Sequence, residues 1–215
     1  MRLKQPLIFF FFLCFFAVSC RASQKIVVAA DGSGDFRTVQ QALDGVPNNN
    51  NQPVVIQIKP GVYNEQIRVS AGKNHVTFRG EDPLKTILTF KLSALQAGNT
   101  RLAFSTLVNA NDFRAENVTF ENTFGTGSQA VALFVDGERA SFENCHFLGW
   151  QDTLFVNGNR HYFKNCYIEG HVDFIFGTAS AIFEDCTIHS KGQGYVNLSK
   201  AECDAAKAKA KESKS

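Results

Sequence analysis

A repeat of 20 to 22 residues in the second half of the chain is the feature that most constrains its fold. Each copy has the pattern of a short strand, with alternating apolar and polar residues, that ends in an Asn or Asp turn. One such strand cannot bury its apolar face alone, and the stacking of successive coils covers that face. We therefore predict an all-β fold, a right-handed parallel β-helix; the Leu-x-x-Leu-x-Leu frame of leucine-rich repeats is missing. The copies are residues 118–123, 141–147, 162–168 and 182–188, with an earlier copy at 76–80, two periods before Phe120.

Stacked coils predict two ladders of equivalent side chains in the interior. One ladder consists of phenylalanines, and the other combines three cysteines with a threonine. Small buried thiols suit a core stack, and the cysteine spacings lack the close CxxC pairs of a zinc site, so we expect no metal. The first ladder is Phe120, Phe142, Phe163 and Phe183, and the second is Thr123, Cys145, Cys166 and Cys186.

The segment before the coils has the pattern of a short helix. Such a helix would cover the amino-terminal end of the solenoid, which otherwise exposes its core and unpaired strand edges. The first coil is then expected to begin with the strand at residues 54–58. The apolar face of the helix would comprise Phe36, Val39, Leu43 and Val46, followed by the stop signals Gly45 and Pro47.

The first residues separate from the rest as a secretory signal peptide. Two basic residues precede an apolar run at residues 7–18, which is too short for a permanent membrane anchor, and small residues then mark a cleavage site. Residues 1–19 are therefore expected to direct secretion to the extracellular space or a cell wall. Cys20 at the new amino terminus leaves a bacterial lipoprotein as the alternative. No later segment has the composition of a stable membrane span.

Charge and length limit the remaining classes of protein. Cleavage after residue 19 removes two of the 22 basic residues and none of the 20 acidic ones, and the resulting neutral chain does not favour nucleic acid as a partner. One domain with a sizeable core is expected over residues 25–196. After Tyr195 we read no further coil or cap, which suggests that carboxy-terminal coils are missing. Residues 197–215, rich in Ala and Lys, are expected to be disordered.

Two acids and two amides recur where strands are expected, namely Asp152, Asp173, Gln129 and Gln151. Carboxylates are costly among Val, Leu, Phe and Ile unless a site uses them. Neighbouring coils are about 4.8 Å apart, so the two acids cannot both ionise at equal cost, and one should keep a proton near neutrality. That division suits an acid and a nucleophile, while the amides can donate hydrogen bonds to an oxyanion. A purely structural role in closing turns better fits Asn144, Asn165 and Asp185.

Four separate motifs stand out along the chain. They are residues 30–36 (ADGSGDF), 59–63 (KPGVY), 149–154 (GWQDTL) and 172–177 (VDFIFG). With these motifs in this order, the chain resembles the pectin methylesterases, the pectinesterase family or carbohydrate esterase family 8, from about residue 25 to residue 195. The resemblance implies a β-helix of the pectin-lyase-like kind. It also implies a cofactor-free extracellular esterase, monomeric if the chain is complete, that converts methyl-esterified pectin (homogalacturonan) to pectate and methanol.

The resemblance implies a role for each of the four polar residues. Asp173 corresponds to the nucleophile, and Asp152 corresponds to the general acid/base. Gln129 and Gln151 correspond to the amides that stabilise the oxyanion.

Three further residues correspond to the substrate groove of the family. Phe155 and Phe176 match aromatic positions that flank the groove. His171 stands where the family most often has Thr or a small residue, and we expect it to contact substrate rather than to act as an acid or base.

One family motif, Leu-Gly-Arg-Pro-Trp, is not found after Tyr195. In the family its Arg orients the nucleophilic carboxylate, and without that partner a carboxylate loses orientation and stabilisation of its anion. A catalytically impaired remnant that binds pectin or the cell wall is therefore an alternative. Another is a pectate lyase or polygalacturonase on the same fold, although such a lyase needs a calcium cluster of several acids and the sequence offers two.

Overall fold

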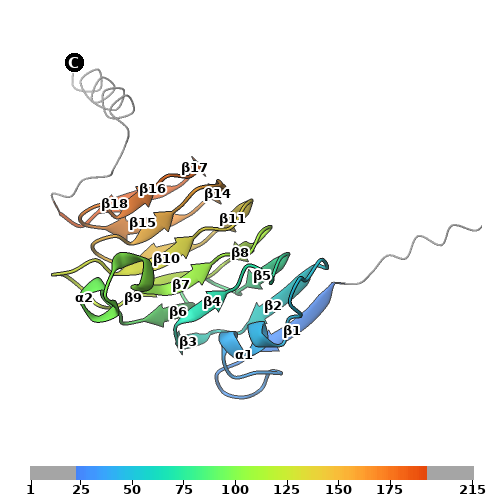
Figure 1. Ribbon diagram of the computed structural model, residues 1–215. Helices are drawn as coiled ribbons and strands as arrows, with labels where there is room; N and C mark the ends of the chain where they lie inside the picture. Colours follow the sequence, from blue (N-terminus) through green and yellow to red (C-terminus); the bar gives the residue numbers. More distant parts are fainter. Residues whose placement is uncertain (1–22, 193–215) are drawn as a thin grey trace, which may run out of the picture.

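The computed structural model describes residues 23–192, and this part of the chain is a stack of β-coils (Figure 1). Successive strands contribute in turn to three sheets, which we call A, B and C, and all strand pairs in them are parallel. The predicted parallel β-helix is confirmed. Sheet A comprises β1 (Gln24–Val28), β2 (Val54–Ile58), β5 (Val76–Arg79), β8 (Arg114–Glu116), β11 (Ala140–Glu143), β14 (Arg160–Lys164) and β17 (Ser180–Glu184). Sheet B comprises β3 (Gly61–Asn64), β6 (Thr86–Phe90), β9 (Thr119–Asn122), β12 (His146–Leu148), β15 (Tyr167–Gly170) and β18 (Thr187–Ser190). Sheet C comprises β4 (Ile67–Val69), β7 (Phe104–Val108), β10 (Val131–Val135), β13 (Leu154–Val156) and β16 (Ile175–Gly177).

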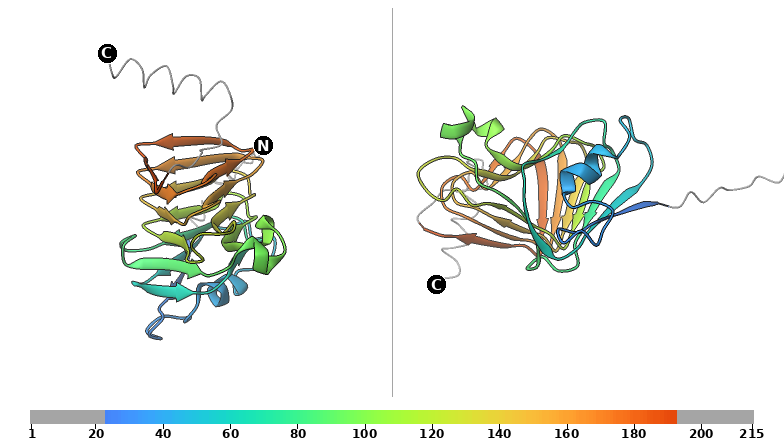
Figure 2. Two further views of the ribbon diagram at one scale, coloured as in Figure 1. Left: turned by 90° about the vertical axis from the view of Figure 1, so that its left-hand side faces the viewer. Right: turned by 90° about the horizontal axis from the view of Figure 1, so that it is seen from below.

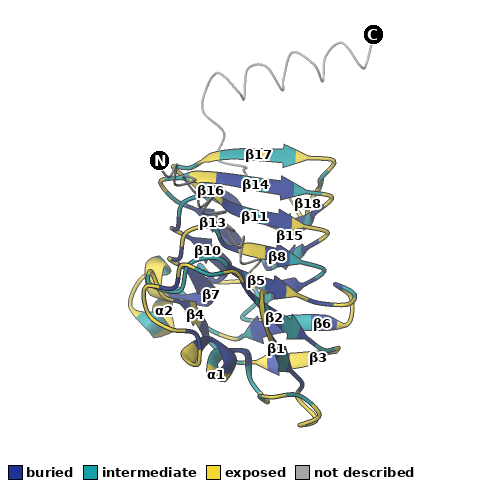
Figure 3. Cartoon of the chain, turned by 90° about the vertical axis from the view of Figure 1, so that its right-hand side faces the viewer, coloured by how far each residue is buried: buried dark blue, intermediate teal, exposed yellow. Residues whose placement is uncertain are grey.

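The three sheets form the walls of the helix, as the end-on view in Figure 2 shows, and buried apolar side chains fill the interior. Figure 3 shows buried residues along the strands of the stacked coils. Phe142, Phe163 and Phe183 form the predicted ladder, with stacked rings whose centroids are 4.9 and 4.7 Å apart. Phe120 does not belong to this ladder, because it lies on β9 of sheet B and pairs with Phe147.

The position of residues 118–123 in sheet B, not sheet A, also changes two other predictions. The copy at residues 76–80 belongs to sheet A and lies one coil before β8, since Phe78 pairs with Ala115, so the prediction that it lies two periods before Phe120 was wrong. The cysteine ladder of Cys145, Cys166 and Cys186 is continued by Val118 and not by Thr123. The amide of the residue after each cysteine donates a hydrogen bond to the carbonyl of the ladder residue one coil earlier, and for Cys145 that residue is Val118. Within residues 23–192, these three cysteines form no disulfide.

Each of the last four corners between sheets A and B is made by a short polar residue with positive φ. The left-handed conformation is least costly for Gly, Asn and Asp, which explains the Asn or Asp at the end of each repeat. The predicted structural role of these residues agrees with this geometry. They are Asn117 (φ 56°), Asn144 (φ 52°), Asn165 (φ 51°) and Asp185 (φ 52°).

The amino-terminal helix α1 (Val39–Asp44) is shorter than the segment predicted. Phe36 forms a bridge with Val28 instead of a helical turn, and Thr38 is the N-cap that accepts a hydrogen bond from the Gln41 amide. The helix packs on β1, β2 and β4 and so covers the end of the coil stack. Strand β1 precedes the helix and pairs with β2, so sheet A begins one strand earlier than residues 54–58. Residues 54–58 form β2, the first strand of the first coil that contributes to all three sheets.

One coil carries an insertion between β6 and β7. It contains α2 (Ala94–Ala97) and the 3₁₀-helix η1 (Thr100–Leu102), which lie outside the coil stack (Figure 1). Ser93 and Gln96 form a capping box at the start of α2, and Gly98 ends it with φ 92°.

The predicted signal peptide (1–19), Cys20 and the tail (197–215) lie outside the described residues. Between residues 23 and 192, no helix is long and apolar enough to cross a membrane.

Candidate functional site

Asp152 and Asp173 lie in the turns that lead into β13 and β16 of sheet C. Leu154 pairs with Ile175, so the two aspartates occupy equivalent positions one coil apart. The Asp152 amide donates a hydrogen bond to the Val172 carbonyl at 3.1 Å, which links the two turns directly. Both aspartates have positive φ, 65° and 47°. The hydrogen-bonded ladder therefore fixes two carboxylates side by side on neighbouring coils.

Burial and charge set the protonation of Asp152. Its side chain is buried, and this burial, followed by the negative charge of Asp173, raises its pKa from 3.8 to about 7. Among residues 23–192, no group donates a hydrogen bond to either carboxylate, and no cation forms an ion pair with them. Below about pH 7 the arrangement therefore favours a neutral Asp152 beside Asp173.

Gln129 and Gln151 lie just before β10 and β13, at the same end of sheet C. The carbonyl of Gln151 accepts a hydrogen bond from the Ala130 amide at 3.0 Å, so the two glutamines come from neighbouring coils with an offset of one residue. Both side chains are half-buried. Within the described part of the chain neither side-chain amide nitrogen donates a hydrogen bond, which leaves these donors available to a bound molecule.

A row of apolar rings crosses the outer face of sheet C beside the acids. Phe155 and Phe176 are stacked with ring centroids 4.3 Å apart, as the sequence places them one coil apart, and Phe134 stacks on Phe155 at 4.2 Å. Phe104 belongs to the same outer cluster. Phe134 was not predicted from the sequence, although it lies one repeat before Phe155. Phe104, which follows the insertion, was not predicted either.

His171 precedes Asp173 by two residues and lies near Trp150. Their ring centroids are 6.3 Å apart, and Lys191 Nζ lies 4.7 Å from the centroid of Trp150. Lys191 also donates to the Gly149 carbonyl at 3.0 Å and pairs with Glu169. These residues, His171 excepted, line a cavity of about 240 Å³. Trp150 and Lys191 were not singled out from the sequence.

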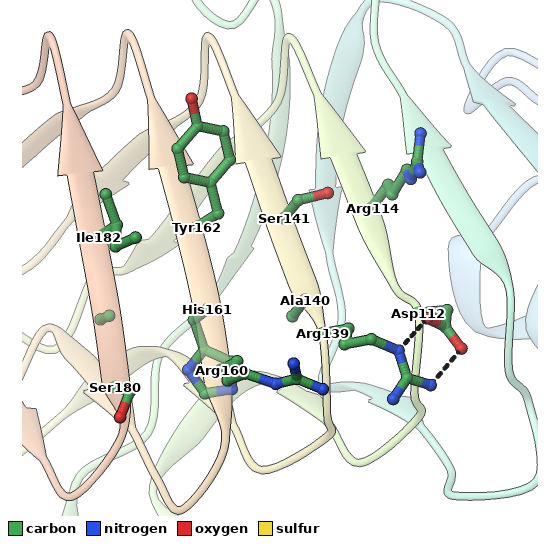
Figure 4. Close-up of a pocket in the computed structure, with 11 residues that line it drawn as sticks. Asp112, Arg114, Arg139, Ala140, Ser141, Arg160, His161, Tyr162, Ser180 and Ile182 are labelled. Atoms are coloured by element: carbon green, nitrogen blue, oxygen red, sulfur yellow. Dashed lines mark hydrogen bonds and ion pairs between the residues drawn. The ribbon is translucent and has the colours of Figure 1, made fainter.

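A larger cavity, of about 620 Å³, lies elsewhere, on the outer face of sheet A (Figure 4). None of the predicted site residues lines it. Two of its arginines are already paired, Arg139 with Asp112 and Arg160 with Glu138. The size of this cavity therefore says less about chemistry than the unpaired acids of sheet C do.

The buried thiols show no sign of reactivity. Burial raises the pKa of Cys145 strongly and that of Cys166 to about 12. Their sulfur atoms contact backbone carbonyls in the core. Within residues 23–192, no group of His, Cys, Asp and Glu side chains is arranged to hold a metal ion.

Comparison with known proteins follows the same motifs. A family model described as Pectinesterase matches residues 25–213. Pectinesterase 31 of Arabidopsis thaliana is 43% identical over 185 residues, which cover 81% of this chain and 58% of that protein. The structure of pectin methylesterase from carrot matches with a TM-score of 0.76 at 39% identity, covering 80% of this chain and 54% of the other. Pectin methylesterase PemA from Erwinia chrysanthemi matches with a TM-score of 0.74 at 30% identity, covering 84% and 59%. The chain thus spans less than two thirds of the length of these relatives.

Proposed function

The chain belongs to the pectinesterase family, and we propose that it hydrolyses the methyl esters of galacturonosyl units in pectin to give pectate and methanol. The observation that carries this proposal is the pair of carboxylates on adjacent coils, of which Asp152 has a pKa raised to about 7. A protonated acid beside a second carboxylate supplies the proton donor and the nucleophile that ester cleavage needs. Comparison with plant and microbial pectinesterases supports extracellular action on cell-wall pectin.

The proposed first half of the reaction forms an acyl-enzyme. A carboxylate oxygen of Asp173 attacks the ester carbonyl, and the amides of Gln129 and Gln151 donate hydrogen bonds to the oxygen that becomes negative. As the tetrahedral intermediate collapses, the carbonyl carbon–methoxy bond breaks and Asp152 gives its proton to methoxide. Methanol leaves, and the substrate carbonyl stays on Asp173 as an anhydride.

The proposed second half restores the enzyme. Asp152, now ionised, takes a proton from water while the water oxygen attacks the substrate carbonyl carbon. The bond to Asp173 breaks, which releases the galacturonate carboxyl group and regenerates both side chains. All the groups involved come from one chain, so the proposal needs neither a cofactor nor a second copy.

Three aromatic side chains are proposed to contact the sugar rings. Phe155 and Phe176 form a stacked apolar row on sheet C, and His171 lies near Trp150. An apolar row of this kind suits the apolar parts of pyranose rings, while the polar groups determine orientation.

Methanol release from methyl-esterified pectin tests the proposal. Asp173→Asn should abolish release, because the amide is nearly isosteric but is a poor nucleophile. Asp185→Asn is the matched control: it makes the same chemical change at a corner turn where Asn117, Asn144 and Asn165 already show that Asn fits. More than a few per cent of activity in folded Asp173→Asn protein would contradict the assignment. Pectin binding without methanol release by the unsubstituted chain would favour the non-catalytic alternative.

A further inference from the structure

Two arginines lie over the aromatic rings on the outer face of sheet C. The guanidinium carbon of Arg101 is 5.3 Å from the ring centroid of Phe155 and 5.8 Å from that of Phe134. The guanidinium carbon of Arg68 is 4.4 Å from the ring centroid of Phe104. Contacts of this kind hold a cation in place while leaving its N–H edge free.

Both guanidinium groups are exposed and lack an acidic partner. Within residues 23–192, neither forms an ion pair or a side-chain hydrogen bond. Glu65, which lies three residues before Arg68, is occupied, since its carboxylate accepts hydrogen bonds from the amides of Val39 and Gln40 at 2.8 and 2.9 Å. Two positive charges therefore remain uncompensated on this face.

The backbone that carries the two arginines is fixed. Arg101 lies in η1, whose N-cap Asn99 accepts a hydrogen bond from the Leu102 amide at 3.2 Å. The side-chain amide of Gln66, the residue before β4, donates to the carbonyl of Leu102 in η1 at 3.4 Å and so ties the insertion to the coil stack. The backbone amide of Arg68 donates to Gln40 Oε1 at 2.8 Å. Little ordering is then required when an anion binds.

The arginines continue a line that begins at the acids. In register across sheet C, Phe176 pairs with Phe155, Phe155 with Phe134, and Phe134 with Leu107. Leu107 in turn pairs with Arg68 on β4. Four strand steps of about 4.8 Å make a line of roughly 19 Å, which is longer than a single sugar ring. A polymer with its ester at Asp173 has neighbouring units within reach of Arg101 first and Arg68 next.

We infer that Arg101 and Arg68 determine specificity by binding the free carboxylates of non-esterified galacturonate units on the β4 side of the ester that is cleaved. This inference rests on the proposed esterase function. A methyl-esterified unit is neutral, whereas a de-esterified unit is an anion whose two oxygens match the forked donors of a guanidinium group. The enzyme therefore prefers substrate that already carries free acids on that side.

The test compares kcat/KM on two oligogalacturonides of equal length, one fully methyl-esterified and one partly de-esterified. Arg101→Gln should lower kcat/KM on the partly de-esterified substrate about tenfold or more, since hydrogen bonds to charged groups are strong. The same substitution should change kcat/KM on the fully methyl-esterified substrate by less than about threefold. Arg101→Lys should recover part of the loss, and Arg68→Gln should have a smaller effect. Arg114→Gln, on the outer face of sheet A, is the matched control and should change neither value. An equal loss on both substrates, or none, overturns the inference.

Binding of a fully de-esterified oligogalacturonate provides a readout that does not depend on catalysis. Calorimetry on the full chain should show weaker binding and a smaller salt dependence in Arg101→Gln than in Arg114→Gln. If no substrate yields methanol but this difference persists, the carboxylate site stands and the esterase proposal fails. If methanol is released and the two variants bind the oligomer equally, the esterase proposal stands and the carboxylate site fails.

Discussion

The outer faces of sheets A and C are built from the same coils, but they differ in how charge is compensated. On sheet A four ion pairs link neighbouring coils, although Arg114 and Glu143 form no ion pair within the described residues. On sheet C the carboxylates of Asp152 and Asp173 and the guanidinium groups of Arg68 and Arg101 lack a charged hydrogen-bonding partner within the described residues. A rigid ladder can hold unpaired charges at fixed spacing, and such charges are available to a ligand. The pairs on sheet A are Arg79 with Glu116, Asp112 with Arg139, Glu138 with Arg160, and Lys164 with Glu184.

The largest effect on this comparison is expected at the amide donors of sheet C. Gln151→Ala should lower kcat about a hundredfold or more with little change in KM, because a donor to the oxyanion acts mainly in the transition state. Steady-state methanol release measures both constants. Tyr162→Phe, which removes a hydrogen-bonding hydroxyl from the outer face of sheet A, is the control and should leave both unchanged. A rise in KM alone would identify Gln151 as a binding residue.

A pH effect of intermediate size is expected from Asp152. Burial and the Asp173 charge raise the pKa of this carboxyl to about 7, so it is protonated below that pH and loses its proton above it. If Asp152 is the proton donor, kcat/KM should fall by up to tenfold for each pH unit above about 7.

The same substitution that removes the nucleophile checks this interpretation. In Asp173→Asn the pKa of Asp152 should fall, since one cause of its shift is lost, yet it should stay above 3.8 because burial is the larger cause. Carbon-13 NMR of the carboxyl group measures both values. A kcat/KM that stays flat between pH 6 and 9 would exclude Asp152 as the proton donor.

The smallest effect is expected at the ion pairs of sheet A. Arg79 and Glu116 form a pair with Nε and Oε2 2.6 Å apart, but Arg79 is exposed to solvent. Arg79→Gln should change the free energy of unfolding by less than about 1 kcal/mol and should not change methanol release. A double-mutant cycle with Glu116→Gln, followed by urea unfolding, measures the coupling. A coupling well above that figure, or a loss of activity, would show that sheet A does more than support the fold.

The sequence predicts the coils well where their lengths are equal. Phe142, Phe163 and Phe183 recur at a nearly constant interval, and their ladder was predicted correctly. Phe120 was misplaced because the segment Thr119 to Asn122 of sheet B looks like the segment that follows Ala140 in sheet A. The repeat contains two strands with similar residues, and periodicity alone does not distinguish them.

Some residues of the candidate site could likewise be predicted from the sequence, and others could not. Asp152, Asp173, Gln129 and Gln151 stand in motifs whose polar residues are unusual among apolar neighbours, so composition alone singles them out. Arg101 belongs to an insertion with no counterpart in the other coils, and only tertiary packing brings it to Phe155. Trp150 and Lys191 are far apart in sequence and two coils apart in the stack, and only tertiary packing brings them together. Residues that follow the repeat can be predicted, whereas those that depart from it cannot.

The insertion between β6 and β7 also bears on how such a protein diversifies. Although α2 and η1 lengthen this coil, β6 still pairs in register with β9, and β7 still pairs with both β4 and β10. A loop of one coil can therefore be replaced without moving the hydrogen-bonded rungs above and below it. Evolution can change the ligand preference of one stretch of the surface by altering a single loop, while the pair of turns at Asp152 and Asp173 is inherited unchanged.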